Sequence, residues 1–264
     1  MVIKTLNERA LKLLQLIYEN DYLTFEDMVL FLGSSGRASE YLSYFKKMNL
    51  VEEFYTGLRP RKAYCVSIWA YNFLKEESLV RSDKRFSVSD YNFTKFPHQN
   101  MCTKVRIILE KHPLVKDFRP QKVAIYLEKQ HGKEVFTKGW KQFDAEMVVE
   151  KDGKEHIFGI EVELTQKSAE SYAKRFLNIE TTRPDVYAVA WFCSDQTIMT
   201  KMLEILRNMQ MKVNTLRHKF CLIESFLKDW FKAEWMDVEG SLYLLPEITM
   251  EQENETENGT EVSH

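Results

Sequence analysis

The chain has few of the residues on which small secreted domains depend. Its four Cys are scattered, at positions 65, 102, 193 and 221, which argues against both a zinc site and a disulfide scaffold and suits a reducing cytoplasm. It contains no recognisable signal peptide and no apolar run long enough to span a bilayer, so we expect a cytoplasmic protein without membrane association. Nine Gly and six Pro are few for 264 residues, whereas 44% of the residues are hydrophobic and 13% aromatic. Such a chain can bury the core of one large or two modest domains.

An excess of positive charge is also missing. The formal net charge is −2, which is the wrong sign for a nucleic-acid-binding protein. Residues 251–264, however, contain five Glu and no Lys or Arg, so the rest of the chain carries +3. Any basic surface must therefore be local. We expect residues 249–264 to be an acidic, disordered tail.

Residues 1–77 have the element order of a winged-helix DNA-binding domain. Three helices are expected over 6–18, 24–32 and 37–48, followed by strands over 50–54 and 63–66 that flank a basic turn. In this arrangement the third helix enters the major groove and the wing lies near phosphates. The exposed side chains expected to bind DNA are Arg37, Ser39, Ser43, Lys46, Lys47, Arg59, Arg61 and Lys62. Small helical domains of this kind also mediate protein contacts, which is the alternative.

Residues 143–164 are expected to form a hairpin that carries four carboxylates on one face. Asp152-Gly153 is a strong signal for a two-residue turn, and this turn places Asp144 opposite Glu161. Strand alternation then gives one face to Asp144, Glu146, Glu161 and Glu163. The other face is apolar, with Phe143, Ala145, Met147, Val149, Ile160, Val162 and Leu164.

The opposed carboxylates need something to offset their repulsion. A divalent cation is one candidate, since hard cations prefer carboxylate oxygens. A solvated outer sheet face is the other. Lys167 and a helix with the apolar stripe Ala169, Tyr172, Ala173 and Phe176 follow directly. Acids that hold Mg²⁺ beside a lysine that stabilises charge on phosphorus form a catalytic arrangement.

A second domain is expected over residues 98–248, after a polar linker at 78–97. Its expected elements are a helix from His98, a strand over 123–127, the hairpin, the helix after Lys167, a buried strand over 185–193, a helix capped by Asp195, a strand over 220–223, a helix over 226–236 and a strand over 241–245. This order predicts a mixed central sheet with helices on both faces. The fold class is therefore α+β with two domains, a winged helix-turn-helix followed by an α/β domain.

The second domain resembles the PD-(D/E)xK, or restriction-endonuclease-like, superfamily. Asp144 matches the first acid of that fold and Glu161-Val162-Glu163 matches its second motif. Glu163 stands where Lys is commonest, and Lys167 is placed to supply the ammonium. With the winged helix, His98, Tyr172 and the run from Glu161 to Ser168, the chain is similar to the MobC-type (MOBC class) plasmid relaxases and to replication-relaxation proteins.

The resemblance implies a metal-dependent nickase that acts at an origin of transfer. Asp144 and Glu161 would bind Mg²⁺ or Mn²⁺, and Glu163 would be a third ligand or orient the attacking water. Lys167 would stabilise the phosphate, and His98 would contact the phosphate or support the acids. Tyr172 would be a nucleophile or, as its place in the apolar stripe favours, a packing residue. The partners implied are double-stranded DNA and accessory mobilisation or coupling proteins.

Two other functions fit the same residues. One is a DNA-binding regulator or replication accessory protein whose nuclease-like domain is not catalytic, which would bind its site without metal. The other is a restriction-type nuclease that cuts both strands as a dimer, since the number of strands cut depends on the oligomeric state.

Overall fold

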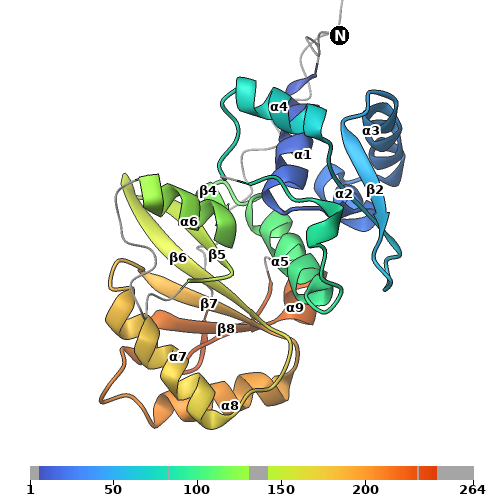
Figure 1. Ribbon diagram of the computed structural model, residues 1–264. Coiled ribbons are helices and arrows are strands. Elements are labelled where there is room, and N and C mark those ends of the chain that lie inside the picture. Colours follow the sequence, from blue (N-terminus) through green and yellow to red (C-terminus); the bar gives the residue numbers. More distant parts are fainter. Residues whose placement is uncertain (1–5, 83, 131–141, 231, 243–264) are drawn as a thin grey trace, which may run out of the picture.

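The computed structural model describes residues 6–82, 84–130, 142–230 and 232–242, and the predicted tail at 249–264 lies outside them. The described residues form a small body of helices around a three-stranded sheet and a larger body built on a mixed sheet (Figure 1). The expected combination of α and β structure with a mixed sheet is confirmed. Within the described residues no helix combines the length and apolar character needed to cross a bilayer.

The small body begins with three helices and an antiparallel sheet in the order β1-β3-β2. Its elements are α1 (Glu8–Glu19), β1 (Leu23–Thr24), α2 (Phe25–Leu32), α3 (Ser35–Lys47), β2 (Val51–Tyr55) and β3 (Lys62–Val66). Thr24 begins α2 as expected, because its hydroxyl and the Asp27 carboxylate form a reciprocal capping box. Gly33 ends α2 with a φ of 74°, a conformation that costs glycine nothing.

The predicted linker at 78–97 is packed against both bodies in its described residues. It follows α4 (Ile68–Glu76) and contains the short helix η1 (Val88–Asp90). Phe86 and Phe96 are buried with Tyr22 and Phe54 in one aromatic cluster. Arg81 forms an ion pair with Asp117 of the larger body at 2.8 Å.

Helix α5 (Phe96–Leu109) begins two residues before the predicted boundary and belongs to both bodies. Ile107 packs into the core of the small body, whereas Val105 and Ile108 pack into the core of the larger one. Arg106, on the same helix, forms a buried ion pair with Glu19 of α1 at 2.6 Å. The two bodies are therefore held together by a shared helix and a buried charge pair.

The larger sheet has the strand order β10-β9-β8-β7-β6-β5-β4. Its strands are β4 (Val115–Pro120), β5 (Ala145–Lys151), β6 (Lys154–Glu163), β7 (Ala188–Cys193), β8 (His218–Leu222), β9 (Trp235–Met236) and β10 (Ser241–Leu242). The pairs β6–β7 and β7–β8 are parallel, and the other neighbouring pairs are antiparallel. Strand β7 is buried along its whole length, as the apolar run at 185–193 predicted.

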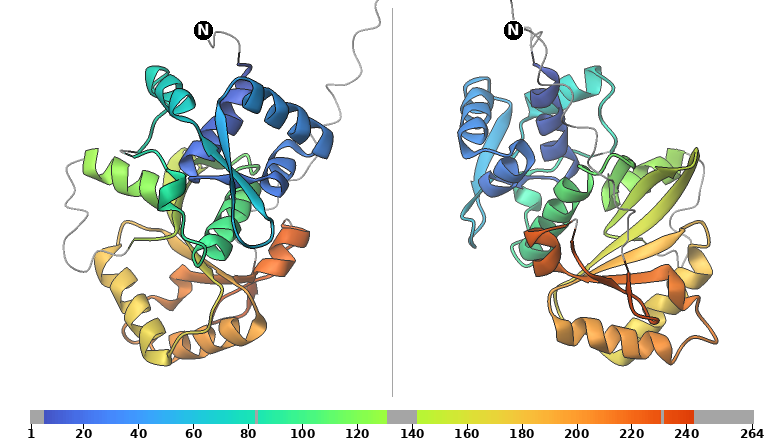
Figure 2. Two further views of the ribbon diagram at one scale, coloured as in Figure 1. Left: turned by 45° about the vertical axis from the view of Figure 1, so that its right-hand side comes forward. Right: turned by 180° about the vertical axis from the view of Figure 1, so that it is seen from behind.

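Helices cover both faces of this sheet (Figure 2). On one face, α5 and α9 (Ile223–Lys228) pack on a core that includes Met147, Ile160 and Phe192. On the other face, α7 (Ala169–Thr182) and α8 (Gln196–Arg207) pack on Trp191 and Phe220. The short helix η2 (Thr215–Arg217) leads into β8.

Three expectations about local structure are wrong. The predicted strand at 123–127 lies in helix α6 (Gln121–Gln130), and the strand at this edge is β4, which precedes it. A short apolar run fits either a strand or a helix, so its length and periodicity could not distinguish between the two. The helix predicted over 226–236 ends at Lys228, and Trp235–Met236 is a strand.

The third wrong expectation concerns Phe143, which does not share the apolar face of Ala145. Its ring packs with Tyr172 and Phe176 on the α7 side of the sheet. Asp144 is a bend before β5, so the alternation of faces does not extend to Phe143. The ring lies against Gly159, where an added Cβ would come within 2.6 Å of it. Gly159 is thus required by a close approach.

Candidate functional site

The hairpin of β5 and β6 has the register that its turn predicts. Lys151 pairs with Lys154 and Ala145 pairs with Ile160, so Asp144 and Glu161 are opposed. The turn residues Asp152 and Gly153 both have positive φ, at 53° and 71°, as a two-residue type I′ turn requires. The predicted acidic residues are therefore brought to one end of the hairpin.

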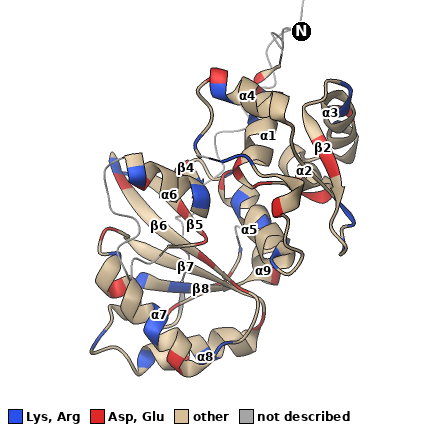
Figure 3. Ribbon diagram, viewed as in Figure 1, with Lys and Arg blue, Asp and Glu red and all other residues tan. Residues whose placement is uncertain are grey.

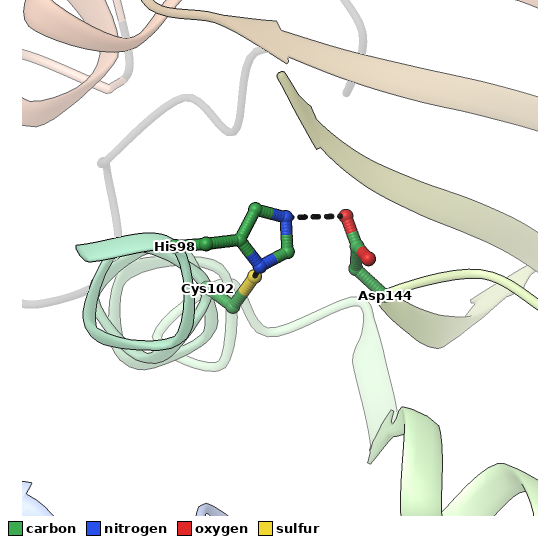
Figure 4. Close-up of side chains that lie close together, drawn as sticks. All are labelled: His98, Cys102 and Asp144. Carbon is green, nitrogen blue, oxygen red and sulfur yellow. Dashed lines mark hydrogen bonds and ion pairs between the residues drawn. The ribbon is translucent and has the colours of Figure 1, made fainter. Parts of the chain in front are cut away.

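Asp144 and His98 meet at this end of the sheet (Figure 4). The Asp144 carboxylate accepts a hydrogen bond from the Val162 amide at 2.8 Å and lies 3.2 Å from His98 Nε2. The same nitrogen lies 3.0 Å from the Val162 carbonyl oxygen. The hydrogen bond with Asp144 raises the pKa of His98, and partial burial opposes the shift. His98 is thus held against the Asp144 carboxylate.

Cys102 adds a thiol to this pair. It lies one turn after His98 on α5, and its Sγ is 3.7 Å from His98 Nδ1. Burial raises the pKa of Cys102 well above its usual value, and the Asp144 charge adds to the shift. The thiol is therefore protonated at neutral pH. His98 and Cys102, at i and i+4, share one helix face in the sequence as well, but the scattered spacing of the four Cys residues gave no reason to count Cys102 as a site residue.

Glu161 and Glu163 lie at the end of β6, where Lys167 and Arg175 of the following segment and α7 contact them. Both are buried, at 0% and 3% exposed, which rules out the solvated outer face. Arg175 of α7 forms an ion pair with Glu161 and lies 3.8 Å from Glu163. Lys167 binds Glu163 at 2.6 Å. Arg175 and Lys167 therefore supply positive charge to Glu161 and Glu163.

Arg175 is a site residue that the sequence analysis missed. It is three residues after Tyr172 in the α7 stripe that faces the sheet, a position on the buried side of the helix. Its guanidinium lies 5.4 Å from the centroid of the Trp191 ring. Burial lowers the pKa of Arg175, and the charge of Asp144 acts in the opposite direction. The sequence pattern of α7 drew attention to its apolar residues. A single Arg on the same face of the helix was the signal that could have identified Arg175 as a site residue.

Glu146 and Tyr172 are both buried and held by contacts within the fold. Glu146 is buried and accepts an ion pair from Arg183 at 2.6 Å. Tyr172 is fully buried, and its hydroxyl accepts a hydrogen bond from the Lys167 amide at 3.1 Å. The packing position expected for Tyr172 is where the structure places it.

The predicted ligand set for Mg²⁺ or Mn²⁺ fits this arrangement poorly. Among the described residues, the group of possible ligands whose donor atoms all lie within 4.8 Å of one another is His98, Cys102 and Asp144. Glu161 and Glu163 are not in that group and are bound to Arg175 and Lys167. A three-carboxylate site would require both ion pairs to break.

A groove of about 800 Å³ opens beside Asp144. It is bounded by the end of α1, the segment at 82–99 and the start of α6, and His98, Cys102 and Asp144 are part of its lining. Four cations also line it, namely Lys84, Arg85, Lys95 and Lys122. Three of them form ion pairs: Lys84 with Asp90, Arg85 with Glu52, and Lys122 with Asp21. Lys95 makes no ion pair with a described residue.

The eight side chains predicted to bind DNA are all exposed. Blue segments mark the cations of α3 and of the turn after β2 in Figure 3. Lys46 and Lys62 share the Glu53 carboxylate at 2.5 and 2.7 Å, and hydrogen bonds from Lys46 and Lys62 lower the pKa of Glu53. Among the described residues, Arg37, Lys47, Arg59 and Arg61 make no ion pair. Four of the six predicted cations therefore remain available to a polyanion.

Comparison with known proteins adds no relative to this description. No family model, no curated protein and no solved structure matches the chain.

Proposed function

We propose that the chain is a DNA-binding protein that nicks one DNA strand at the Asp144 centre. The carrying observation is that Asp144 and His98 line the same groove as four cationic side chains. Asp144 is about one fifth exposed, and the cations beside it attract phosphate, although three of them are paired with acids. By analogy with MobC-type relaxases, the substrate would be an origin-of-transfer-like site, with accessory mobilisation or coupling proteins as partners.

The small body supports DNA binding as a winged helix. Its order α1-β1-α2-α3-β2-β3 is the order of that fold, with α3 as the recognition helix and the turn at 56–61 as the wing. The cations Arg37 and Lys47 of α3 and Arg59 and Arg61 of the wing are placed to contact phosphates or base edges.

The larger body supports a nuclease-like reading through its connectivity. The hairpin β5–β6, the helix α7 and the parallel strand β7 follow one another as in the core of the PD-(D/E)xK fold. In the sequence, Asp144 and the pair Glu161 and Glu163 match the two acidic motifs of that fold. Lys167 remains about one third exposed while bound to Glu163, so its ammonium is accessible for stabilising a phosphate.

Mg²⁺ or Mn²⁺ is proposed as a requirement of the reaction on the strength of the resemblance alone. Asp144 is the one predicted ligand that lines the groove. The roles proposed for the chain itself are phosphate binding by the groove cations, positioning of Asp144 by His98 and the Val162 amide, and charge stabilisation by Lys167.

A specific observation favours a second function, that of a DNA-binding regulator without catalysis. Arg175 pairs with Glu161 and lies 3.8 Å from Glu163, so it offsets their charge without a metal ion. A domain of this kind would keep its fold and its DNA contacts and would cleave nothing.

A nicking assay distinguishes the two functions. Supercoiled plasmid that carries the native locus is incubated with the wild-type chain or with Asp144→Asn, with and without Mg²⁺ or Mn²⁺. Open circles from the wild type alone are expected, with the gel shift of the variant unchanged. Linear product would instead indicate a dimeric double-strand nuclease, and a gel shift without cleavage under every metal would establish the regulator.

Salt dependence tests the DNA-binding surface separately from cleavage. The double variant Arg59→Ala/Arg61→Ala is expected to reduce the slope of log affinity against log salt by about 2, because each phosphate contact contributes roughly one unit. Lys12→Ala is the matched control, since Lys12 is an exposed cation on α1, paired with Glu8, outside the proposed surface. An equal slope in wild type and double variant would place DNA elsewhere on the molecule.

A further inference from the structure

His98, Cys102 and Asp144 offer a different set of donor atoms from the one that the acidic motif predicts. His98 and Cys102 are four residues apart on one face of α5, and Asp144 begins the hairpin across from them (Figure 4). One donor atom from each residue lies within 4.8 Å of the other two. A thiol, an imidazole and a carboxylate suit borderline ions such as Zn²⁺, whereas Mg²⁺ requires oxygen ligands.

The hydrogen bonds of the imidazole fix which nitrogen is available to an ion. Nε2 faces the Val162 carbonyl oxygen at 3.0 Å and the Asp144 carboxylate at 3.2 Å, and both groups are acceptors. Nε2 therefore carries the proton, and Nδ1 presents its lone pair toward Cys102 Sγ. Metal-bound histidines show the same pattern, in which the outer N–H donates to a carboxylate or a carbonyl. Here the Val162 carbonyl oxygen keeps that role, and the Asp144 carboxylate turns from Nε2 toward the ion.

The spacing of the two donors on α5 also fits. Zinc–sulfur and zinc–nitrogen bonds of about 2.3 and 2.0 Å place the two ligand atoms roughly 3.6 Å apart in a tetrahedron. The observed distance from Sγ to Nδ1 is 3.7 Å. An ion between them requires little movement of the helix.

We propose that Cys102, His98 and Asp144 form a binding site for a borderline transition-metal ion such as Zn²⁺ in preference to Mg²⁺. Cys102 Sγ and His98 Nδ1 supply two ligands, and an Asp144 carboxylate oxygen supplies the third. Binding displaces the thiol proton to solvent, so that the thiolate coordinates the ion. Three protein ligands leave a fourth position for water or a phosphate oxygen from the groove, which is the pattern of catalytic zinc sites.

The site has a route by which an ion can enter. The His98 side chain is 42% exposed, and all three residues line the groove of about 800 Å³. The other three Cys residues are buried. Metal binding is measured without DNA, so a failure of the proposed nicking activity leaves this inference unaffected, and the reverse also holds.

Cobalt provides the first test, because a thiolate bound to Co²⁺ gives a ligand-to-metal charge-transfer band in the near ultraviolet. The full chain is titrated with Co²⁺, then with Zn²⁺ in competition, and Mg²⁺ is titrated by calorimetry. We expect the band in the wild type, its displacement by Zn²⁺, its absence in Cys102→Ser, and much weaker binding of Mg²⁺. His156→Ala is the matched control, since His156 lies outside the cluster, and it should behave as wild type.

Asp144→Asn tests the third member of the site. The variant is expected to lower Zn²⁺ affinity tenfold or more, the usual effect of losing a ligand or the carboxylate that orients a ligating histidine. Affinities equal to the wild type would overturn the three-residue site. A thiolate band that persists in Cys102→Ser, or Mg²⁺ binding as tight as Zn²⁺ binding, would overturn it as well.

A measurement on the wild-type chain alone covers the case in which a variant does not fold. Cys102 is alkylated with iodoacetamide with and without Zn²⁺, and the labelled residue is identified by peptide mass spectrometry. Zn²⁺ is expected to slow labelling of Cys102 at least tenfold relative to Mg²⁺. Equal labelling rates with both ions would contradict the proposal.

Discussion

Asp144 and Glu161 are opposed in one hairpin register, yet the two carboxylates lie in contrasting surroundings. Asp144 is about one fifth exposed, lines a groove and contacts a histidine and a backbone amide. Glu161 is fully buried and bound by Arg175, whose guanidinium lies over the Trp191 ring. Asp144 can thus exchange ligands with solvent, whereas Glu161 is held in a closed charge pair with Arg175.

Backbone position explains this difference better than residue type. Asp144 is a bend before β5, so its side chain is directed toward α5 and the groove. Glu161 lies within β6, opposite Trp191 of β7, and is covered by α7. Like charges at opposed positions need not mark a metal site when a neighbouring helix supplies a cation.

The largest expected effect comes from removing that cation. Arg175→Ala takes the guanidinium away from a buried carboxylate, and breaking a buried pair in this way costs about 3–5 kcal/mol. Urea unfolding at neutral pH measures the loss. If the α7 side is a closed charge pair, adding Glu161→Gln to Arg175→Ala should recover part of the stability, because the buried charge is then absent.

Lys174→Ala is the matched control for this experiment. Lys174 precedes Arg175 on α7 but is exposed, so its removal should change stability by no more than about 0.5 kcal/mol. An Arg175→Ala chain as stable as the control would mean that the pair with Glu161 contributes nothing, and the contrast between the two carboxylates would fail.

The second-largest expected effect is a pH dependence of stability caused by His218, a buried histidine on the α7 side. His218 is fully buried against Phe176, and its Nδ1 accepts a hydrogen bond from Trp191 Nε1. Burial, followed by the charges of Arg217 and Lys219, lowers the pKa of His218 from 6.5 to about 3. The stability that depends on neutral His218 is therefore present above pH 6.5 and is lost as the pH falls toward 3.

His218→Asn keeps an acceptor for Trp191 and removes the titration. Between pH 6.5 and pH 4 the wild type should lose as much as about 3 kcal/mol more than this variant, at roughly 1.4 kcal/mol per unit. Urea unfolding of both chains at pH 7, 5.5 and 4 tests the difference. Parallel losses in the two chains would show that protons reach His218 in the native state and that the α7 side is open.

The sequence was sufficient where a local rule fixes the backbone. The Asp152-Gly153 turn determined the hairpin register, and with it the opposition of Asp144 and Glu161. The capping residues Thr24 and Asp195 placed the starts of two helices. In each case a short segment carries its own hydrogen-bonding requirement, so the prediction does not depend on the rest of the fold.

The sequence was not sufficient where tertiary contacts decide. Arg175 was missed because its partner Glu161 is 14 residues away on another element, and no local rule joins them. Phe143 crossed to the other face because Gly159 leaves room for its ring. The run at 123–127 became helical although its composition also suits a strand. These outcomes depend on packing between segments, which periodicity does not describe.

The smallest expected effect on stability comes from His98, on the groove side. Its pKa shift is opposite in sign to that of His218. The hydrogen bond with Asp144 raises the pKa of His98 above 6.5, although burial acts against it. The stability gained from charged His98 is therefore fully present below pH 6.5 and is lost as the pH rises through the raised pKa. Solvent exposure of this side chain keeps the effect well below that at His218.

Titration of the imidazole C–H signals by NMR measures this difference directly. The His98 signal should titrate above pH 6.5 in the wild type and at lower pH in Asp144→Asn, because the carboxylate is the largest cause of the shift. His218 should show no titration above pH 4 in either chain. A His98 pKa below 6.5 in the wild type would mean that burial outweighs Asp144. The groove side would then resemble the closed side, since both histidines would remain neutral near pH 7.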